Sequence, residues 1–315
     1  MIGTDDGSTL ARNILQAFHF DPEILSHDFA QKVGKNTIHK LLGAEVLKTF
    51  RFFADFFKKP FHFNKQISQF GEFMKSQYIL AIDQGTTGST VSLYNERGQV
   101  VKRADKDFEQ IFPKPGWVEH RTSDIWETVL YGIGEVVSKI DARQIAAIGI
   151  TNQRETVAAW NRTTGEPVMN AIVWQCRRTT EECQKLKPKE KVVRAKTGLL
   201  MDPYFSASKM AWILKNNEKA KKLAANNQLC FGTMDTFLIW QLTKGQSYKT
   251  DPSNASRTML FHLKKQIFDK ELLKLFKISA DALPEIEFNN GHFGVTKGVP
   301  GLPDGIPIHG VIGDQ

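Results

Sequence analysis

The chain has 315 residues, a formal net charge of +8, 41% hydrophobic residues and 24% charged residues. This length predicts roughly two domains, and it is sufficient to bury a core without disulfides. No run of about 18 apolar residues could cross a bilayer, and Met1 is not followed by the basic and apolar segments of a secretory signal. These properties exclude a transmembrane or disulfide-scaffolded protein and lead us to expect a cytoplasmic one.

Lysine and arginine are scattered, and the densest runs, at 187–194 and 219–222, are mixed or short. We interpret these runs as solvated helix faces, so no nucleic-acid partner is expected. The cysteines Cys176, Cys183 and Cys230 form no CxxC pair, and such a sparse set favours a reducing compartment. Because no histidine is suitably spaced nearby, we expect core or surface thiols and no metal site.

Residues 1–73 differ in texture from the rest of the chain. Segments 10–18 and 36–57 carry apolar residues at helical spacing, and 51–63 is rich in phenylalanine interleaved with basic residues. We predict a helical extension and consider three interpretations. The preferred one is a segment not native to the protein, with Met74 as the natural start. The second is a helical hairpin with its own core, and the least favoured is a membrane-surface helix.

From Tyr78 onward, short apolar runs alternate with turns in the pattern of an α/β fold. Strands at 78–83, 90–94 and 100–108, joined by tight turns, predict a β-meander. A helix is predicted from Thr122 or Ser123 to about Lys139. Further strands are predicted at 145–151, 156–160, 171–174 and 306–312. Further helices are predicted at 179–187, 206–216, 233–243 and 269–276. This order predicts a mixed sheet flanked by helices.

The sequence DQGTTGS at 83–89 lies between the first two predicted strands. A glycine turn exposes backbone N–H groups, and Thr86 and Thr87 add hydroxyls, so the turn can bind phosphate oxygens. Asp83, at the end of a buried strand, can hold Mg²⁺ directly or through water. The Walker pattern GxxxxGK[ST] is absent. A bare hairpin turn is the alternative, and for this motif in isolation it is the better interpretation.

Two further groups suggest a site for a small polyol. Arg154 and Glu155 follow an apolar strand, and this donor and acceptor can together bind adjacent hydroxyls. The alternative is a surface ion pair of little energetic value. Trp174 can pack on the carbon face of a polyol, with the Tyr204 hydroxyl above that pocket. On spacing alone, an ordinary core tryptophan is favoured.

Asp314 follows the last predicted strand, and only Gln315 comes after it. An aspartate at a strand end suits a general base that takes a proton from an attacking hydroxyl. A helix N-cap is the alternative, because aspartate fills that position well.

These motifs occur in the order DQGTT, FPKPGWVEH, IGITNQRET, NAIVWQCRRT, TGL followed by DPYFSASK, FGTMDTFLIWQLT, TDPSNASRTMLF and GDQ. In this order they resemble the glycerol kinases, within the family of FGGY carbohydrate kinases. The resemblance covers about 78–315, and residues 1–73 match no part of that family known to us. We therefore expect a helical extension at 1–73 and an FGGY N-terminal domain at 74–315.

The resemblance implies a ribonuclease-H-like lobe of the actin and hexokinase superfamily, with an active site in a cleft between two lobes. It implies ATP, Mg²⁺ and glycerol as ligands, and sn-glycerol 3-phosphate as product. Asp83 would lie near the metal, and Asp314 would be the base. The nucleotide phosphates would be bound by Thr86, Thr87, Gly88 and Thr90. Glycerol would be surrounded by Arg154, Glu155, Trp174, Tyr204, Asp314 and Gln315.

A kinase of another polyol or a pentose in the same family is the nearer alternative, and a non-catalytic lobe that docks through residues 1–73 is the more distant one. The sequence is compatible with a homo-oligomer. Two residues depart from the family pattern. Many glycerol kinases carry arginine where this chain has Thr90, so contact with ADP is expected to weaken. Arg121 stands where an acidic residue is common and suggests no function.

The family's second, adenine-binding lobe is missing from this sequence. We therefore expect a truncated or interrupted reading frame, weak glycerol binding and phosphoryl transfer far below normal by the chain alone, because positioning and electrostatics dominate this reaction.

Overall fold

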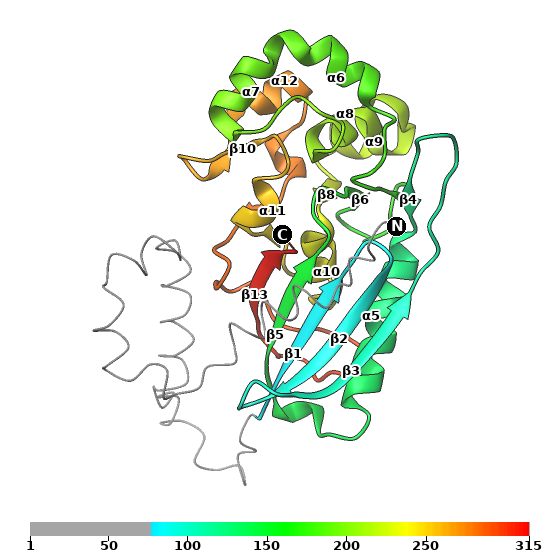
Figure 1. Cartoon of the computed structure of the whole chain (residues 1–315), viewed down its shortest axis with the longest axis vertical. Helices are drawn as coiled ribbons and strands as arrows, with labels where there is room; N and C mark the ends of the chain where they lie inside the picture. Colours follow the sequence, from blue (N-terminus) through cyan, green and yellow to red (C-terminus); the bar gives the residue numbers. More distant parts are fainter. Residues whose placement is uncertain (1–76, 315) are drawn as a thin grey trace, which may run out of the picture. The chain divides into compact units, whose positions relative to one another are not determined.

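The computed structural model describes residues 77–314, and the predicted helical extension at 1–73 lies outside them. The centre is a five-stranded mixed sheet in the order β13-β5-β1-β2-β3 (Figure 1). Its strands are β1 (Tyr78–Gln84), β2 (Gly88–Asn95), β3 (Val100–Asp107), β5 (Ile145–Asn152) and β13 (Ile308–Gly313). Strands β1 to β3 form the predicted antiparallel meander, and β5 lies parallel to both β1 and β13. The predicted mixed sheet is confirmed.

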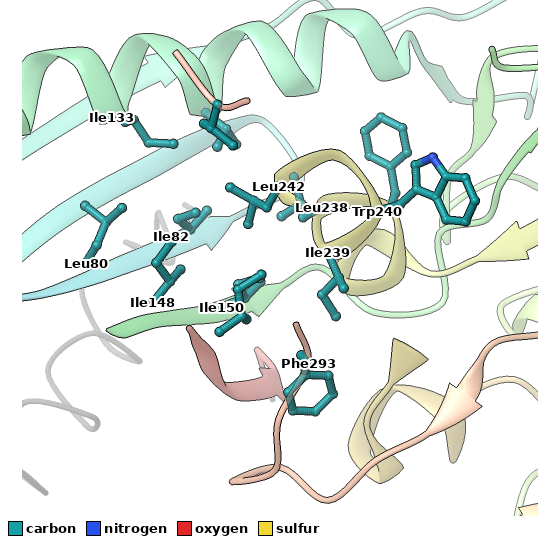
Figure 2. Packing of buried hydrophobic residues seen from close by; sticks show 14 of the residues in the cluster. Leu80, Ile82, Ile133, Ile148, Ile150, Leu238, Ile239, Trp240, Leu242 and Phe293 are labelled. Atoms are coloured by element: carbon teal, nitrogen blue, oxygen red, sulfur yellow. The ribbon is translucent and has the colours of Figure 1, made fainter. Parts of the chain in front are cut away.

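One face of the sheet is buried because alternate residues of β1 and β5 are aliphatic. Leu80, Ile82, Ile148 and Ile150 point to this face and are almost fully buried. Helices α5 (Thr122–Val137) and α10 (Met234–Leu242) supply the other side of this core (Figure 2). Gly132 allows α5 to lie close to β2, since a Cβ at this position would overlap the side chain of Val91.

A second hydrophobic core lies beyond the strand ends, where several helices gather above the arrowhead of β5 (Figure 1). Its helices are α6 (Thr180–Leu186), α7 (Glu190–Thr197), α8 (Ser206–Asn216), α9 (Glu218–Ala225) and α12 (Lys270–Phe276). Cys176 and Cys183 belong to this core, whereas Cys230 belongs to the sheet core, and all three thiols are free and buried. Of the predicted core or surface thiols, all three are therefore core thiols.

The other elements are short. The strands are β4 (Glu119–His120), β6 (Ala158–Asn161), β7 (Ala171–Ile172), β8 (Leu229–Gly232), β9 (Lys249–Thr250), β10 (Phe261–His262), β11 (Ile267–Phe268) and β12 (Glu285–Ile286). The remaining helices are α11 (Pro252–Ala255) and the 3₁₀ segments η1 (Ala142–Gln144), η2 (Lys187–Lys189) and η3 (Ala280–Ala282). Within the described residues, no helix is both long and apolar enough to cross a membrane.

Several predicted boundaries were wrong by two residues or more. Strand β2 begins at Gly88 and not at Thr90, because Gly88 already pairs with Asp107. Strand β6 begins at Ala158, because the amide of Thr156 turns back to donate to the carbonyl of Arg154. Helix α5 ends at Val137. Strand β8 was missed, since four apolar residues between two helices carry no distinct period.

Candidate active site

Three parallel strands end at the same edge of the sheet, below the helices of the second core (Figure 1). Strand β1 ends at Asp83 and Gln84, Arg154 and Glu155 follow shortly after β5, and Asp314 follows β13. Because these strands are parallel and in register, their carboxyl ends lie side by side. Ligands of open α/β sheets bind beyond such carboxyl ends. The fold thus brings together residues that are far apart in the sequence.

The turn between β1 and β2 has the donors that an anion site needs. The amide of Gly85 donates to the carbonyl of Gly88 at 2.9 Å, and the carbonyls of Thr86 and Thr87 accept bonds from Gln110 Nε2 and from the amide that follows β3. Among residues 77–314, the amides of Thr86 and Thr87 have no hydrogen-bond acceptor. Free N–H groups on a tight turn favour phosphate oxygens.

A buried amide network holds this turn from behind. Gln153 Nε2 donates to Gln84 Oε1 at 3.2 Å, and Gln110 joins His120 Nε2 at 2.7 Å while donating to the carbonyl of Thr86 at 3.1 Å. Burial lowers the pKa of His120 to about 4, so its ring is neutral at pH 7. The sequence motifs contain both Gln153 and His120 without indicating a role for either, because a buried network is visible only in three dimensions.

The carboxylates of Asp83 and Asp314 interact electrostatically near this turn. Burial, and next the charge of Asp314, raise the pKa of Asp83 to about 6. Burial also raises the pKa of Asp314, although Arg154 opposes this rise. Arg154 Nε lies 3.7 Å from Asp314 Oδ1. A cation close to Asp83 and Asp314 would therefore relieve an unfavourable pair of charges.

The carboxylates fit a magnesium–nucleotide complex better than a bare metal site. Within the described residues, no group of three or more His, Cys, Asp or Glu side chains is arranged to hold a metal ion. Mg²⁺ in phosphoryl-transfer enzymes is held by one or two carboxylates together with phosphate oxygens and water. Asp83 and Asp314 together provide two carboxylates.

Arg154 and Glu155 do not pair with one another. Arg154 lies against Asp314, whereas Glu155 Oε1 accepts a bond of 2.5 Å from Arg257 Nε. The Glu155 side chain is almost fully buried, and its backbone adopts a φ of 63°. Burial raises the pKa of Glu155, and Arg257 opposes that rise. The alternative of a surface ion pair between Arg154 and Glu155 was therefore wrong.

Arg257 is a member of the site that the sequence does not predict. It follows α11 and lies within the motif TDPSNASRTMLF. Its guanidinium lies 4.9 Å from the ring of Phe205 and 5.7 Å from the ring of Tyr204. A single charge in a polar segment gives no sign of its partner, so only the fold could connect Arg257 with Glu155.

A pair of aromatic rings contacts the turn between β1 and β2. The rings of Trp174 and Tyr204 lie 5.3 Å apart, and Trp174 Nε1 donates to Thr86 Oγ1 at 3.0 Å. Trp174 also packs against the second core while remaining partly exposed. It is thus neither an ordinary core tryptophan nor a surface residue. Its indole connects the helices of the second core to the turn between β1 and β2.

Lys209 fixes the segment that carries Tyr204. Its side chain is fully buried, and its Nζ donates to the carbonyls of Pro203, Tyr204 and Phe205 at 2.7, 2.6 and 3.1 Å. Three acceptors match the three donors of an ammonium group. Lys209 therefore holds the backbone of the segment that carries Tyr204.

Thr87, Gly88 and Thr90 lie at or next to the turn between β1 and β2. Thr87 is exposed, and a Cβ at Gly88 would lie 2.6 Å from Asp107 Oδ1, so only glycine fits there. The Thr90 hydroxyl donates to Asp105 Oδ1 at 2.6 Å. Gln315 lies outside the described residues.

Comparison with known proteins agrees with this architecture. Residues 78–315 match the family described as FGGY family of carbohydrate kinases, N-terminal domain. The chain belongs to the FGGY carbohydrate kinases. The glycerol kinase of Bdellovibrio bacteriovorus is 52% identical to this FGGY chain over 244 residues, which are 76% of the chain and 49% of that protein. The glycerol kinase of Desulforamulus reducens is 48% identical over 246 residues, 77% of this chain and 49% of that protein. The FGGY chain spans about half the length of these relatives.

Solved structures give the same picture. A glycerol kinase of Plasmodium falciparum with ADP superposes with a TM-score of 0.73 and 38% identity, covering 78% of this FGGY chain and 50% of that one. A gluconate kinase from Lactobacillus acidophilus superposes with a TM-score of 0.67 and 27% identity, covering 75% of this FGGY chain and 48% of that one. The predicted fold, a mixed-sheet lobe of the actin and hexokinase type, is confirmed.

Proposed function

We propose that this FGGY domain binds glycerol and the phosphates of ATP in an enzyme that forms sn-glycerol 3-phosphate. The observation that carries the proposal is the hydrogen bond from Trp174 to Thr86, which joins an aromatic pair to a turn with free amides. Glycerol kinases at 52% and 48% identity support glycerol as the substrate.

The polar groups of the site suit a short polyol. Each hydroxyl both donates and accepts a hydrogen bond. Arg154 and Arg257 offer donors, and Glu155 and Asp314 offer acceptors, within one group of strand ends and loops. Trp174 and Tyr204 provide apolar surface for the carbon chain. We assign Gln315 to the same pocket as part of the proposal.

Asp314 is the proposed general base. It accepts the proton of a terminal glycerol hydroxyl as that oxygen forms a bond to the γ-phosphorus of ATP, and the bond from this phosphorus to the ADP oxygen breaks. The amides of Thr86 and Thr87 bind phosphate oxygens. Asp83 would hold Mg²⁺, which would supply positive charge to offset that of the phosphates. Since the reaction consumes ATP, we place the protein in the cytoplasm.

A kinase of a longer polyol or a sugar is the second candidate, because solved gluconate and xylulose kinases at 27% identity share this lobe. Glycerol is favoured because the glycerol kinases are more similar in sequence. A lone binding lobe without catalysis is the third candidate.

Ligand-observed NMR on the 315-residue chain distinguishes these candidates. We expect saturation transfer to glycerol, weaker transfer to erythritol and xylulose, and loss of the glycerol signal in Trp174→Ala. Asp314→Asn is a second test of the glycerol site. Asp304→Asn, in an exposed loop, is its control. A clear preference for xylulose would replace glycerol as the substrate, and no transfer to any polyol would favour the non-catalytic lobe.

A further inference from the structure

A charged cluster on the other side of the phosphate-binding turn includes Asp83 together with residues of β2 and β3 that the proposed reaction does not use. In the sheet register, Asp83 of β1 lies opposite Thr90 of β2, and Thr90 lies opposite Asp105 of β3. Residues directly opposite each other in antiparallel strands project from the same face. Arg103 is two residues before Asp105 and therefore shares that face. The cluster consists of Asp83, Thr90, Arg103 and Asp105.

Asp105 holds the guanidinium of Arg103 in a fork. Arg103 Nε donates to both carboxylate oxygens of Asp105 at 3.1 Å, and Nη2 donates to Oδ1 at 2.7 Å. The Thr90 hydroxyl donates to the same Oδ1 at 2.6 Å, which fixes the carboxylate in turn. Within residues 77–314, the Nη1 group of Arg103 has no hydrogen-bond partner. A fixed guanidinium with free donors is thus presented to solvent.

Stability alone does not account for this arrangement. The side chains of Arg103 and Asp105 are 45% and 57% exposed, and exposed ion pairs contribute little to folding. The cluster instead lies close to the turn, where a bound polyphosphate would concentrate negative charge. Strands β1 and β3 are two strand spacings apart, about 9–10 Å, which an arginine side chain can largely span.

The other guanidinium groups of the site are already engaged. Arg154 lies against Asp314, and Arg257 is bonded to Glu155, both on the proposed glycerol side. A polyphosphate bound at the turn would add several negative charges beside Asp83 and Asp314. A guanidinium on the hairpin side would offset them, because charge-assisted bonds from arginine to phosphate are strong and directional.

We propose that Arg103 is a phosphate-binding residue of this site, and that Asp105 and Thr90 position its guanidinium to contact a terminal phosphate oxygen of the bound nucleotide. This inference rests on the proposed function. It also assigns Thr90 an indirect role, because its hydroxyl is bonded to Asp105 and acts on the nucleotide through Arg103.

The test is calorimetric titration of the 315-residue chain with magnesium tripolyphosphate. We expect Arg103→Ala to weaken binding by about 10- to 100-fold, the worth of one hydrogen bond between charged groups. Arg103→Lys should bind with intermediate affinity, because it keeps the charge but loses the fork. The melting temperature of Arg103→Ala should stay close to that of the wild type, since the pair is exposed.

Arg143→Ala is the matched control. Arg143 forms the same fork with Asp141, through Nε at 2.9 and 3.0 Å and Nη2 at 2.6 Å, and is exposed as well. It lies in η1, just before β5, at the opposite end of the strands from the turn. Its loss should leave tripolyphosphate affinity unchanged.

Each outcome decides between the two proposals. If the wild type binds tripolyphosphate and Arg103→Ala binds equally well, the role of Arg103 is wrong while the phosphate-binding turn stands. Equal weakening by Arg103→Ala and Arg143→Ala would indicate a net-charge effect and would also overturn it. If the wild type does not bind at all, both the role of Arg103 and the proposed phosphate site fail.

Discussion

Gly313 sets the distance between Arg154 and Asp314. A Cβ at position 313 would overlap Cδ of Arg154 and lie 2.6 Å from its Cγ. The Arg154 side chain therefore crosses β13 at Gly313, where no side chain blocks it, and its Nε lies 3.7 Å from Oδ1 of Asp314. A glycine before an aspartate is easily interpreted as a turn residue, but here it creates space for a neighbouring side chain.

We predict that Gly313→Ala lowers glycerol affinity about tenfold while changing the melting temperature by only a few degrees. The added methyl group moves Arg154 away from Asp314, so the donor and the base lose their alignment. NMR titration with glycerol measures the affinity. Gly134→Ala is the control, because a Cβ there meets no atom within 4 Å. Unchanged affinity in Gly313→Ala would show that Arg154 does not bind the substrate.

Lys209→Met should destabilise the chain by about 2–4 kcal/mol, because three buried or partly buried carbonyls lose their donor. Urea unfolding followed by fluorescence gives the free energy. Lys215→Met is the control, since Lys215 is exposed and its bond among residues 77–314 is to Glu182, and its loss should cost about 0.5 kcal/mol or less. If both substitutions have equally small effects, Lys209 does not hold the Tyr204 segment.

Among the secondary-structure elements, buried polar side chains connect α10, β9 and α11 to the sheet. Asp235 of α10 accepts bonds from Thr233 and from Thr250 of β9 at 2.5 and 2.6 Å. Asp251 caps α11 and accepts from Asn254 Nδ2 at 2.7 Å. Ser253 Oγ in turn accepts from the amide of Gly313 at 2.7 Å, at the end of β13. This network links α10, β9 and α11 to the strand that precedes Asp314.

The pH dependence of stability tests this network. Burial, and next the charge of Asp251, raise the pKa of Asp235 from 3.8 to about 7. Between these pH values the folded state binds a proton that the unfolded state has released, so this group lowers the free energy of unfolding as pH rises through that range. Asp235→Asn removes this contribution. We expect the stability of the variant relative to wild type to increase from about pH 4 to about pH 7.

Urea unfolding at several pH values measures this difference. Asp304→Asn is the control of opposite sign, because the amide of Gly298 lowers the pKa of Asp304 in the folded state. That carboxylate stabilises the fold above its unfolded pKa, so the variant should lose relative stability as pH rises. A pH-independent difference for Asp235→Asn would mean that Asp235 is ionised throughout.

The chain as a whole spans 49% of the Bdellovibrio glycerol kinase and holds the groups proposed to bind glycerol and phosphate. Phosphoryl transfer depends almost entirely on positioning and electrostatics. We therefore predict that the chain of 315 residues forms ADP in a glycerol-dependent manner far more slowly than the Bdellovibrio enzyme, by a factor of at least about 10³. A coupled ADP assay on both proteins gives the ratio, and comparable rates would contradict the prediction.

Local sequence patterns are sufficient to predict the meander, the longer helices and the strand ends that carry the site. Alternating aliphatic residues such as Leu80 and Ile82 predict a half-buried strand, and turn residues mark where it stops. The sequence motifs also lead to Asp83, Arg154 and Asp314, because each of these residues closely follows an apolar run.

The pairing of these residues depends on the tertiary fold. Glu155 binds Arg257 across 102 positions, Trp174 binds Thr86 across 88, and Arg103 shares a sheet face with Asp83 through strand register. No local pattern encodes such contacts, because they depend on how strands and helices pack at long range. The sequence specified the chemical groups, and packing around the two cores placed them together.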